Sequence, residues 1–144
     1  MDPKMTVEVA MTDAEVVDLS EWTVAREGEA PTAEFGGAEL AGRKMLGSAT
    51  GELLTAGAAT MLVRLDLKAG FDQDGHEHPD HESIGYIVSG ELEMTVGGNS
   101  MTLRAGDTWY HPKGVFHTAR AVVDSIALEF HAPLRPDVLK LFGR

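Results

Sequence analysis

The chain has 144 residues, 43% of them apolar, which is enough for one folded domain with its own core. It contains no cysteine, which excludes disulfides, thiolate metal sites and thiol nucleophiles, so any metal must be held by nitrogen and oxygen ligands. The formal net charge of −11 argues against nucleic acid and anionic membranes as partners. The first residues do not form a signal peptide and no window approaches the roughly 20 apolar residues of a membrane span, so we expect a cytoplasmic protein.

Residues 1–59 carry weak structural signals. Val7–Met11 and Glu15–Val17 could be strands or sheet edges, and Lys44–Leu54 could form another β pair. Glu27–Glu39 is rich in Gly, Ala, Pro and Thr, and this composition predicts a loop. We interpret residues 1–59 as strands and a loop that pack on the rest of the chain or on a dimer partner.

Residues 60–144 have the pattern of short strands separated by glycine, and turn signals recur about every 8–12 residues, as in an all-β sandwich or barrel. The turn Gly97-Gly98-Asn99 between two alternating runs is a hairpin signal. Pro136–Phe142 predicts one short helix, since proline suits the first helical position and apolar residues follow. The predicted strands are Thr60–Leu67, Ile84–Ser89, Glu91–Val96, Ser100–Arg104, Asp107–His111, Phe116–Ala121 and Ser125–His131.

Three of the six histidines could converge on one metal ion. His76 and His78 should lie on one face of a strand, because side chains alternate with period two. His117 returns on a later strand and could supply a third imidazole. Neutral imidazole is the commonest metal ligand, and three protein ligands leave positions open for water or substrate.

These residues lie in two blocks that resemble the two motifs of the cupin family. The resemblance implies an all-β fold, namely a cupin-type double-stranded β-helix (jelly-roll) barrel with N-terminal strands and a short C-terminal helix. It also implies a divalent transition metal as cofactor, and the ligand types suit Zn, Ni, Fe or Mn. The matching positions are Gly70, His76, His78 and Gly90 in the first block and Gly106, Pro112, Gly114 and His117 in the second.

The fourth ligand position departs from the cupin pattern. Glu82 has the expected spacing from His78, but seven residues separate Glu82 from Gly90, one more than the motif has. Counting back from Gly90 selects Ser83, which is a poor ligand for these metals. A bulge could bring Glu82 to the metal, or three histidines and water could hold it, and His81 is a weaker alternative. We predict the ligand set His76, His78, Glu82 and His117.

The inward-facing side chains of such a barrel should line a cup around the metal. Alternation predicts that these include Arg64, Met94, Trp109, Glu129 and His131. A buried carboxylate near a metal would be a natural general acid or base, although Glu129 could instead lie on the outer face. His111 is more typical of a pocket-lining histidine than of a ligand.

A closer resemblance is to the small cupins of pectin degradation, which convert unsaturated uronate monomers into linear keto sugars. It is carried by His78-Pro79, by residues 84–91 and by residues 96–98. Those proteins have a D-x-F-x-P-x-R pattern on the last strand, and the residues here are Glu129, His131, Pro133 and Arg135.

This resemblance implies that Glu129 and Arg135 line the site, with Arg135 binding a substrate carboxylate. An equally open interpretation is that Arg135 forms a cap or ion pair beside the C-terminal helix. We therefore predict Glu129 and His131 as catalytic residues, and Arg135, Trp109 and Arg64 as substrate-binding residues.

The leading functional hypothesis is a metal-dependent isomerase or lyase that acts on a small, oxygenated, carboxylated molecule by Lewis-acid and acid–base chemistry. The alternatives are an Fe(II)-dependent dioxygenase, a non-catalytic binding module, and a degenerate cupin without metal. The resemblance further implies a homodimer that pairs or exchanges its N-terminal strands.

Overall fold

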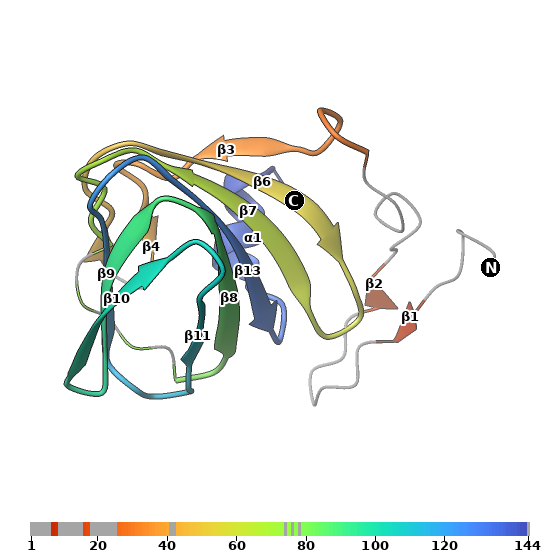
Figure 1. The fold of residues 1–144 in the computed structure, drawn as a ribbon. Helices are drawn as coiled ribbons and strands as arrows, with labels where there is room; N and C mark the ends of the chain where they lie inside the picture. The colour runs from red at the N-terminus through yellow and green to blue at the C-terminus, as the bar shows by residue number, and fades with distance from the viewer. Residues whose placement is uncertain are drawn as a thin grey trace.

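The computed structural model describes residues 7–8, 16–17, 26–40, 43–73, 75, 77 and 79–143. Most of these residues form two antiparallel sheets that curve around a shared core (Figure 1). The larger sheet has the strand order β11 (Thr108–His111), β8 (Glu82–Ser89), β13 (Ser125–Ala132), β7 (Met61–Leu67), β6 (Ala49–Ala56) and β3 (Thr32–Glu34). The smaller sheet has the order β10 (Asn99–Arg104), β9 (Glu91–Val96) and β12 (His117–Ala121). The predicted all-β barrel is confirmed.

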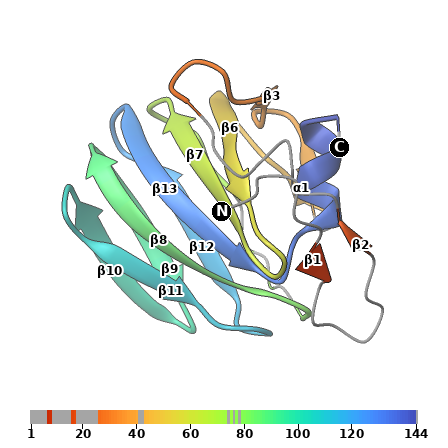
Figure 2. The same cartoon turned by 90° about the vertical axis from the view of Figure 1, so that its right-hand side faces the viewer.

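Strand β8 shows the side-chain alternation that positions the interior of the barrel. Ser83 and Ile87 are buried, whereas Ile84, Tyr86 and Val88 are exposed on the outer face. Because neighbouring strands in a sheet keep their pleats in register, β13 has the same in–out phase as β8 beside it (Figure 2).

The hairpin between β9 and β10 forms where the glycines predict it. The last residue pair joins Val96 to Asn99, so the turn consists of Gly97 and Gly98. Both glycines have positive φ angles, 56° and 84°, which residues with a side chain rarely adopt.

The prediction of a loop over Glu27–Glu39 is wrong for the residues that form β3. Thr32–Glu34 pairs with β6, opposite Thr50–Glu52, and forms the edge of the large sheet. Alanine and glutamate are weak strand formers, so the pairing depends on tertiary contacts. Phe35 packs directly over Gly51, where a Cβ atom would lie 2.5 Å from the Phe35 ring. Glu34 Oε1 accepts hydrogen bonds from the backbone of Gly36 and Ala49, which anchors the strand end.

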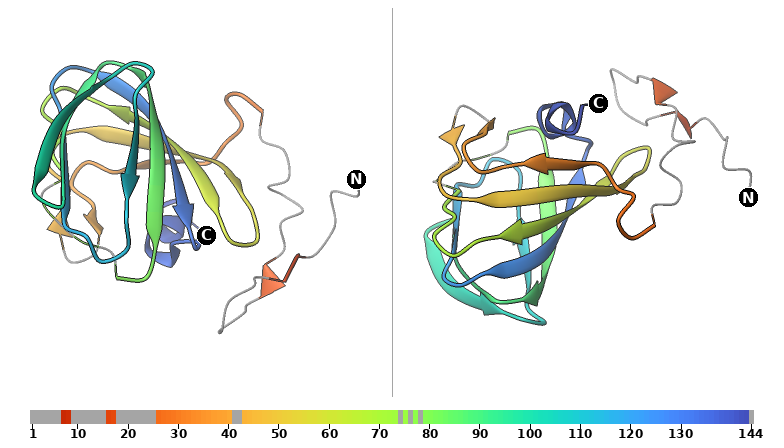
Figure 3. Two further views of the ribbon diagram at one scale, coloured as in Figure 1. Left: turned by 60° about the horizontal axis from the view of Figure 1, so that its bottom comes forward. Right: turned by 90° about the horizontal axis from the view of Figure 1, so that it is seen from above.

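The predicted C-terminal helix is α1 (Pro136–Leu141), with proline in its first turn. It lies outside the strands of the barrel, as the end-on views of Figure 3 show. Its Val138 is 1% exposed, and the ring of Phe142 after it lies 5.8 Å from the ring of Phe35. The helix therefore closes one side of the core.

The remaining strands are short pairs. β4 (Glu39–Leu40) pairs with β5 (Arg43–Lys44), and β1 (Val7–Glu8) pairs with β2 (Val16–Val17). Most of the N-terminal segment on which we predicted strands lies outside the described residues. Within the part of the chain that the structure describes, no helix is long and apolar enough to cross a membrane.

Candidate metal centre and adjoining cavity

His117 opens strand β12 and is fully buried. Its Nδ1 lies 3.2 Å from the carbonyl oxygen of Val115, to which it can donate a hydrogen bond. This bond places the proton on Nδ1 and the lone pair on Nε2, the arrangement typical of a metal-ligating histidine. The His111 ring stacks on the His117 ring, with centroids 3.8 Å apart and an interplanar angle of 15°.

The other two predicted histidine ligands, His76 and His78, lie outside the described residues. The backbone that leads to them does run beside β12. Gln73 N donates to Ala119 O at 2.9 Å, and Gly75 packs against the ring of Phe116, which directly precedes His117. A Cβ atom on Gly75 would lie 1.9 Å from that ring, so the approach requires glycine. Among the described residues alone, no three histidine or carboxylate side chains are grouped as metal ligands.

Glu82 lies on the outer face of the barrel. Its Oε2 accepts a hydrogen bond of 2.7 Å from the hydroxyl of Tyr110, which is 50% exposed. A bulge could have turned Glu82 inward, but the register shift in the pairing of β8 lies at Ile126/Ala127, toward the Ser89 end of β8. The structure therefore does not bring Glu82 together with the buried His117.

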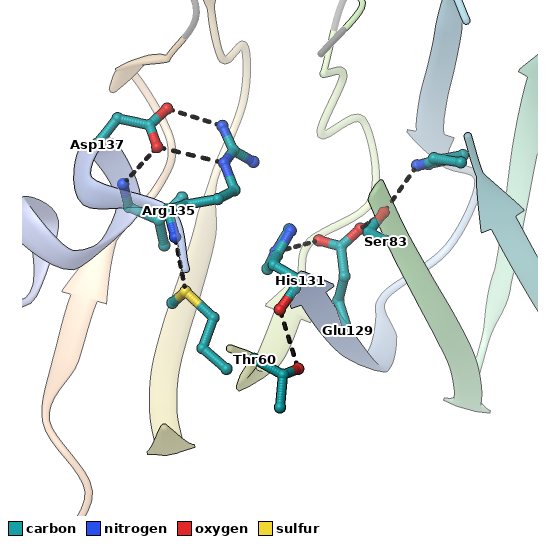
Figure 4. A network of polar contacts seen from close by, with 9 residues as sticks. Thr60, Ser83, Glu129, His131, Arg135 and Asp137 are labelled. Carbon is teal, nitrogen blue, oxygen red and sulfur yellow. Dashed lines mark hydrogen bonds and ion pairs between the residues drawn. The ribbon is translucent and has the colours of Figure 1, made fainter. Parts of the chain in front are cut away.

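Ser83 faces inward and joins a buried polar network (Figure 4). Its hydroxyl donates to Glu129 Oε2 at 3.1 Å and lies 3.3 Å from His111 Nδ1. The other nitrogen of His111 lies 3.2 Å from the sulfur of Met94, on the opposite sheet. Sequence reasoning placed Ser83 at the inward position by its distance from Gly90 but did not predict that the hydroxyl would bind Glu129.

Glu129 and His131, the predicted catalytic pair, both face the interior. Glu129 Oε1 lies 3.1 Å from His131 Nε2, and the two side chains are 13% and 5% exposed. Burial works to raise the pKa of Glu129, but His131 against the carboxylate, together with His111 and Arg135, holds that pKa below its ordinary range.

Arg135 is buried between β13 and α1. Its Nε and Nη2 donate to the two carboxylate oxygens of Asp137, at 3.2 and 2.7 Å. Burial works to raise the pKa of Asp137, but the hydrogen bonds and charge of Arg135 outweigh it, so the pKa lies below its usual value. The guanidinium also borders the interior cavity, so the ion-pair and pocket-lining interpretations of Arg135 both describe its position.

The interior cavity has a volume of about 50 Å³, room for a few water molecules. One wall is apolar and includes Phe35, Met45 and Val138. The polar end carries Trp109, His111, Glu129, His131 and Arg135.

Of two predicted substrate-binding residues, one lines the cavity and the other lies outside it. Trp109 lines the cavity and lies over Gly85, where a Cβ atom would meet its indole ring at 2.0 Å. Arg64 lies outside the cavity, on the outer face of β7, with Nη1 3.8 Å from Glu52. The inward phase of β7 is set by Met61, Val63 and Leu67, which places residue 64 outside.

Comparison with known proteins finds a family whose model matches part of this chain. Residues 63–132 match the cupin domain family. The pectin degradation protein KdgF of Dickeya dadantii (strain 3937) is 25% identical over 89 residues, which are 61% of this chain and 81% of that protein.

Solved structures give the same picture. KdgF from Halomonas sp. superposes with a TM-score of 0.60 at 27% identity, covering 62% of this chain and 83% of that one. An RmlC-like cupin from Shewanella frigidimarina NCIMB 400 superposes with a TM-score of 0.69 at 23% identity, covering 81% of this chain and 95% of that one. The similarity to the second structure supports the fold and nothing about function.

Proposed function

We propose that the chain is a small cupin, since residues 63–132 match the cupin domain family, and that it is a metal-dependent enzyme acting on a small, oxygenated, uronate-like substrate. The proposed ligands are His76, His78 and His117. When bound, a divalent transition metal such as Zn, Ni, Fe or Mn supplies Lewis-acid polarisation of a substrate oxygen.

The observation that carries the metal proposal is the setting of His117. The imidazole is fully buried, and its Nδ1 faces a backbone carbonyl, so the lone pair lies on Nε2. The backbone of Asp72 and Gln73, which precede His76 closely in the chain, is bonded alongside β12, and this supports His76 as a partner of His117. Because Glu82 bonds Tyr110 on the outer face, the proposed set contains three histidines and no carboxylate.

The substrate proposal rests on the polar end of the cavity. Arg135 is 5% exposed and borders the cavity, where it can contribute positive charge to the binding of a substrate carboxylate. Its bonds to Asp137 hold the guanidinium in one orientation. The relatives named for pectin degradation favour a uronate among small carboxylated sugars. Glu129 and His131 lie at the same end and are the groups available to move a proton.

Elemental analysis and turnover together test this function. Protein purified without chelator should carry about one transition metal per chain, lost in His76→Ala and in His117→Ala. Glu82→Gln is the matched control and should keep its metal. The loaded protein should convert an unsaturated uronate equally with and without O₂, whereas strict dependence on O₂ would indicate a dioxygenase. A wild-type chain without metal would contradict the proposal.

We also propose that the chain forms a homodimer through the outer face of its large sheet. Five large side chains without formal charge are exposed there on three neighbouring strands, namely Ile84, Tyr86, Val88, Tyr110 and Phe130. Two copies that each carry a net charge of −11 repel one another, and the repulsion is weakened where these five uncharged side chains, with Glu82 bonded to Tyr110 beside them, form the surface.

A further inference from the structure

His131 is held in one orientation by contacts at its backbone and its ring. Its carbonyl oxygen accepts a hydrogen bond of 2.9 Å from the hydroxyl of Thr60. Its Nε2 lies 3.1 Å from Glu129 Oε1, and Figure 4 shows the ring directed at that carboxylate. His131 as a whole is 4% exposed, so both ring nitrogens are shielded from solvent.

The Glu129 carboxylate is engaged at both oxygens. His131 lies against Oε1, and the Ser83 hydroxyl donates to Oε2 at 3.1 Å. The positive field of Arg135 and His111 also favours the ionised form of the carboxylate. An ionised carboxylate only accepts hydrogen bonds, so the proton shared with His131 belongs to Nε2 of the imidazole.

A neutral imidazole carries one proton, so a proton on Nε2 leaves a lone pair on Nδ1. His131 Nδ1 is buried and has no hydrogen-bond partner among the residues that the structure describes. The titratable groups that face the ring are Glu129 on its own strand and His81, whose ring centroid lies 5.9 Å away, with Arg135 close to both. A buried acceptor without a partner at a cavity is expected to serve a ligand.

Trp109 supplies the complementary group. Its Nε1 is likewise buried without a hydrogen-bond partner in the described part of the chain, and its ring lines the same cavity as His131. The indole N–H can only donate. The cavity thus presents one unused acceptor and one unused donor, which suits a molecule with a hydroxyl group near a second oxygen.

We propose that His131 Nδ1 is the proton acceptor of the site, that Glu129 is the positioning residue that keeps the proton on Nε2, and that Trp109 Nε1 donates to a neighbouring substrate oxygen. Only the substrate class in this inference rests on the proposed function. Glu129 stays ionised throughout and forms an ion pair with the imidazolium once His131 has taken the proton.

The proton transfer balances without a further reactant. For a cyclic hemiacetal, the hydroxyl O–H bond breaks as the Nδ1–H bond forms. The freed electron pair makes the carbonyl, and the ring C–O bond breaks. The imidazolium then gives its proton to the ring oxygen that left with the electron pair of the broken C–O bond, so that His131 is neutral again at the end of the cycle.

The tautomer of His131 can be measured on the wild-type protein by long-range ¹H–¹⁵N NMR with ¹⁵N-labelled histidine. The expected spectrum at neutral pH has a protonated Nε2 and an unprotonated Nδ1, assigned by the signals that vanish in His131→Gln. Glu129→Gln should weaken the preference, because an amide can donate as well as accept. Glu93→Gln, which removes an exposed carboxylate paired with Arg120, is the control and should leave these signals unchanged. A proton on Nδ1, or on both nitrogens, would overturn the inference.

Kinetics on the metal-loaded enzyme provide the second readout. His131→Gln should lower kcat by about 10²- to 10⁴-fold with little change in KM or in metal content, as for the loss of a general base. If His131→Gln keeps kcat within about twofold while Glu129→Gln abolishes turnover, Glu129 is the base and the inference is wrong. A wild-type protein that lacks metal and does not turn over a uronate would contradict the proposed function. The NMR spectrum would still decide the role of His131.

Discussion

Glu82 and Ser83 are adjacent in the chain, yet β8 directs their side chains to opposite faces of the barrel. The serine hydroxyl is a poor ligand for these metals and is engaged by Glu129 and His111. A three-histidine centre would leave an additional coordination position for substrate oxygens.

Removing the Ser83 hydroxyl should disturb the polar network without affecting metal binding. In Ser83→Ala, Glu129 Oε2 loses its donor, so the free energy of unfolding should fall by about 1–2 kcal/mol. Urea unfolding measures that loss, and elemental analysis should find the metal unchanged. Loss of metal in Ser83→Ala would show that the hydroxyl is itself a ligand.

Gly85 matters because it has no side chain, which leaves room for a neighbouring ring. It lies opposite both Trp109 and Glu129, and a Cβ atom there would meet the indole at 2.0 Å. We expect Gly85→Ala to destabilise the fold by about 1–3 kcal/mol, because the large ring must move in a packed interior.

Trp109 fluorescence should change in the same variant. Gly57→Ala is the matched control, since its added Cβ would lie 3.6 Å from its nearest neighbour, Thr60, and its φ is not positive. Equal stability of the two variants would contradict the steric account of Gly85.

At the scale of elements, α1 depends on an ion pair at its first turn. Arg135 bonds both oxygens of Asp137, and this outweighs the effect of burial and lowers the pKa of the carboxyl. A carboxylate whose pKa is lower in the folded chain stabilises the fold above its unfolded pKa of about 3.9, and this contribution is lost as pH falls through the folded pKa.

Asp137→Asn should therefore reduce the free energy of unfolding at pH 7, and its difference from wild type should shrink toward zero as pH falls through the lowered folded pKa of Asp137. Urea unfolding across this pH range measures the difference. Asp66→Asn, which affects the exposed pair with Lys68, should show a smaller effect at pH 7. A difference for Asp137→Asn that does not vary with pH would exclude the ion pair as its cause.

Sequence patterns predicted those elements whose side chains alternate and whose turns contain glycine. β9 and β10 follow from period-two patterning and the Gly97-Gly98 turn, and most of β8 follows from the apolar run Ile84–Ser89. β3 could not be predicted, because Thr32–Glu34 gains its strand from pairing with β6 and from the contact of Phe35 with Gly51.

The same distinction applies to the candidate site. Alternation along β13 correctly placed Glu129 and His131 inside, because that strand lies in the middle of the sheet with one clear inner face. Arg64 was assigned to the wrong face, since the phase of β7 is decided by burial of Met61 and Val63. The bonds among Ser83, Glu129 and His131 join strands far apart in the chain, and no local pattern encodes them.

At the scale of the whole molecule, the exposed apolar face of the large sheet leads to a prediction of oligomeric state. Light scattering at micromolar concentration should give the mass of two chains, and Tyr86→Glu should give that of one, because it places two carboxylates at the proposed interface. Thr102→Glu, exposed on the smaller sheet, should remain a dimer. A wild-type monomer would contradict the proposal.

The walls of the cavity come from different parts of the chain. Three residues of the polar end, Trp109, Glu129 and His131, lie inside the matched domain of residues 63–132. Phe35 and Met45 come before that domain, and Arg135 and Val138 come after it. Substitutions in the segments outside the shared domain can therefore reshape the pocket while the reacting groups stay in place. New substrate preferences can be sought by grafting the segment that carries Phe35 and Met45, together with helix α1, from one such protein to another.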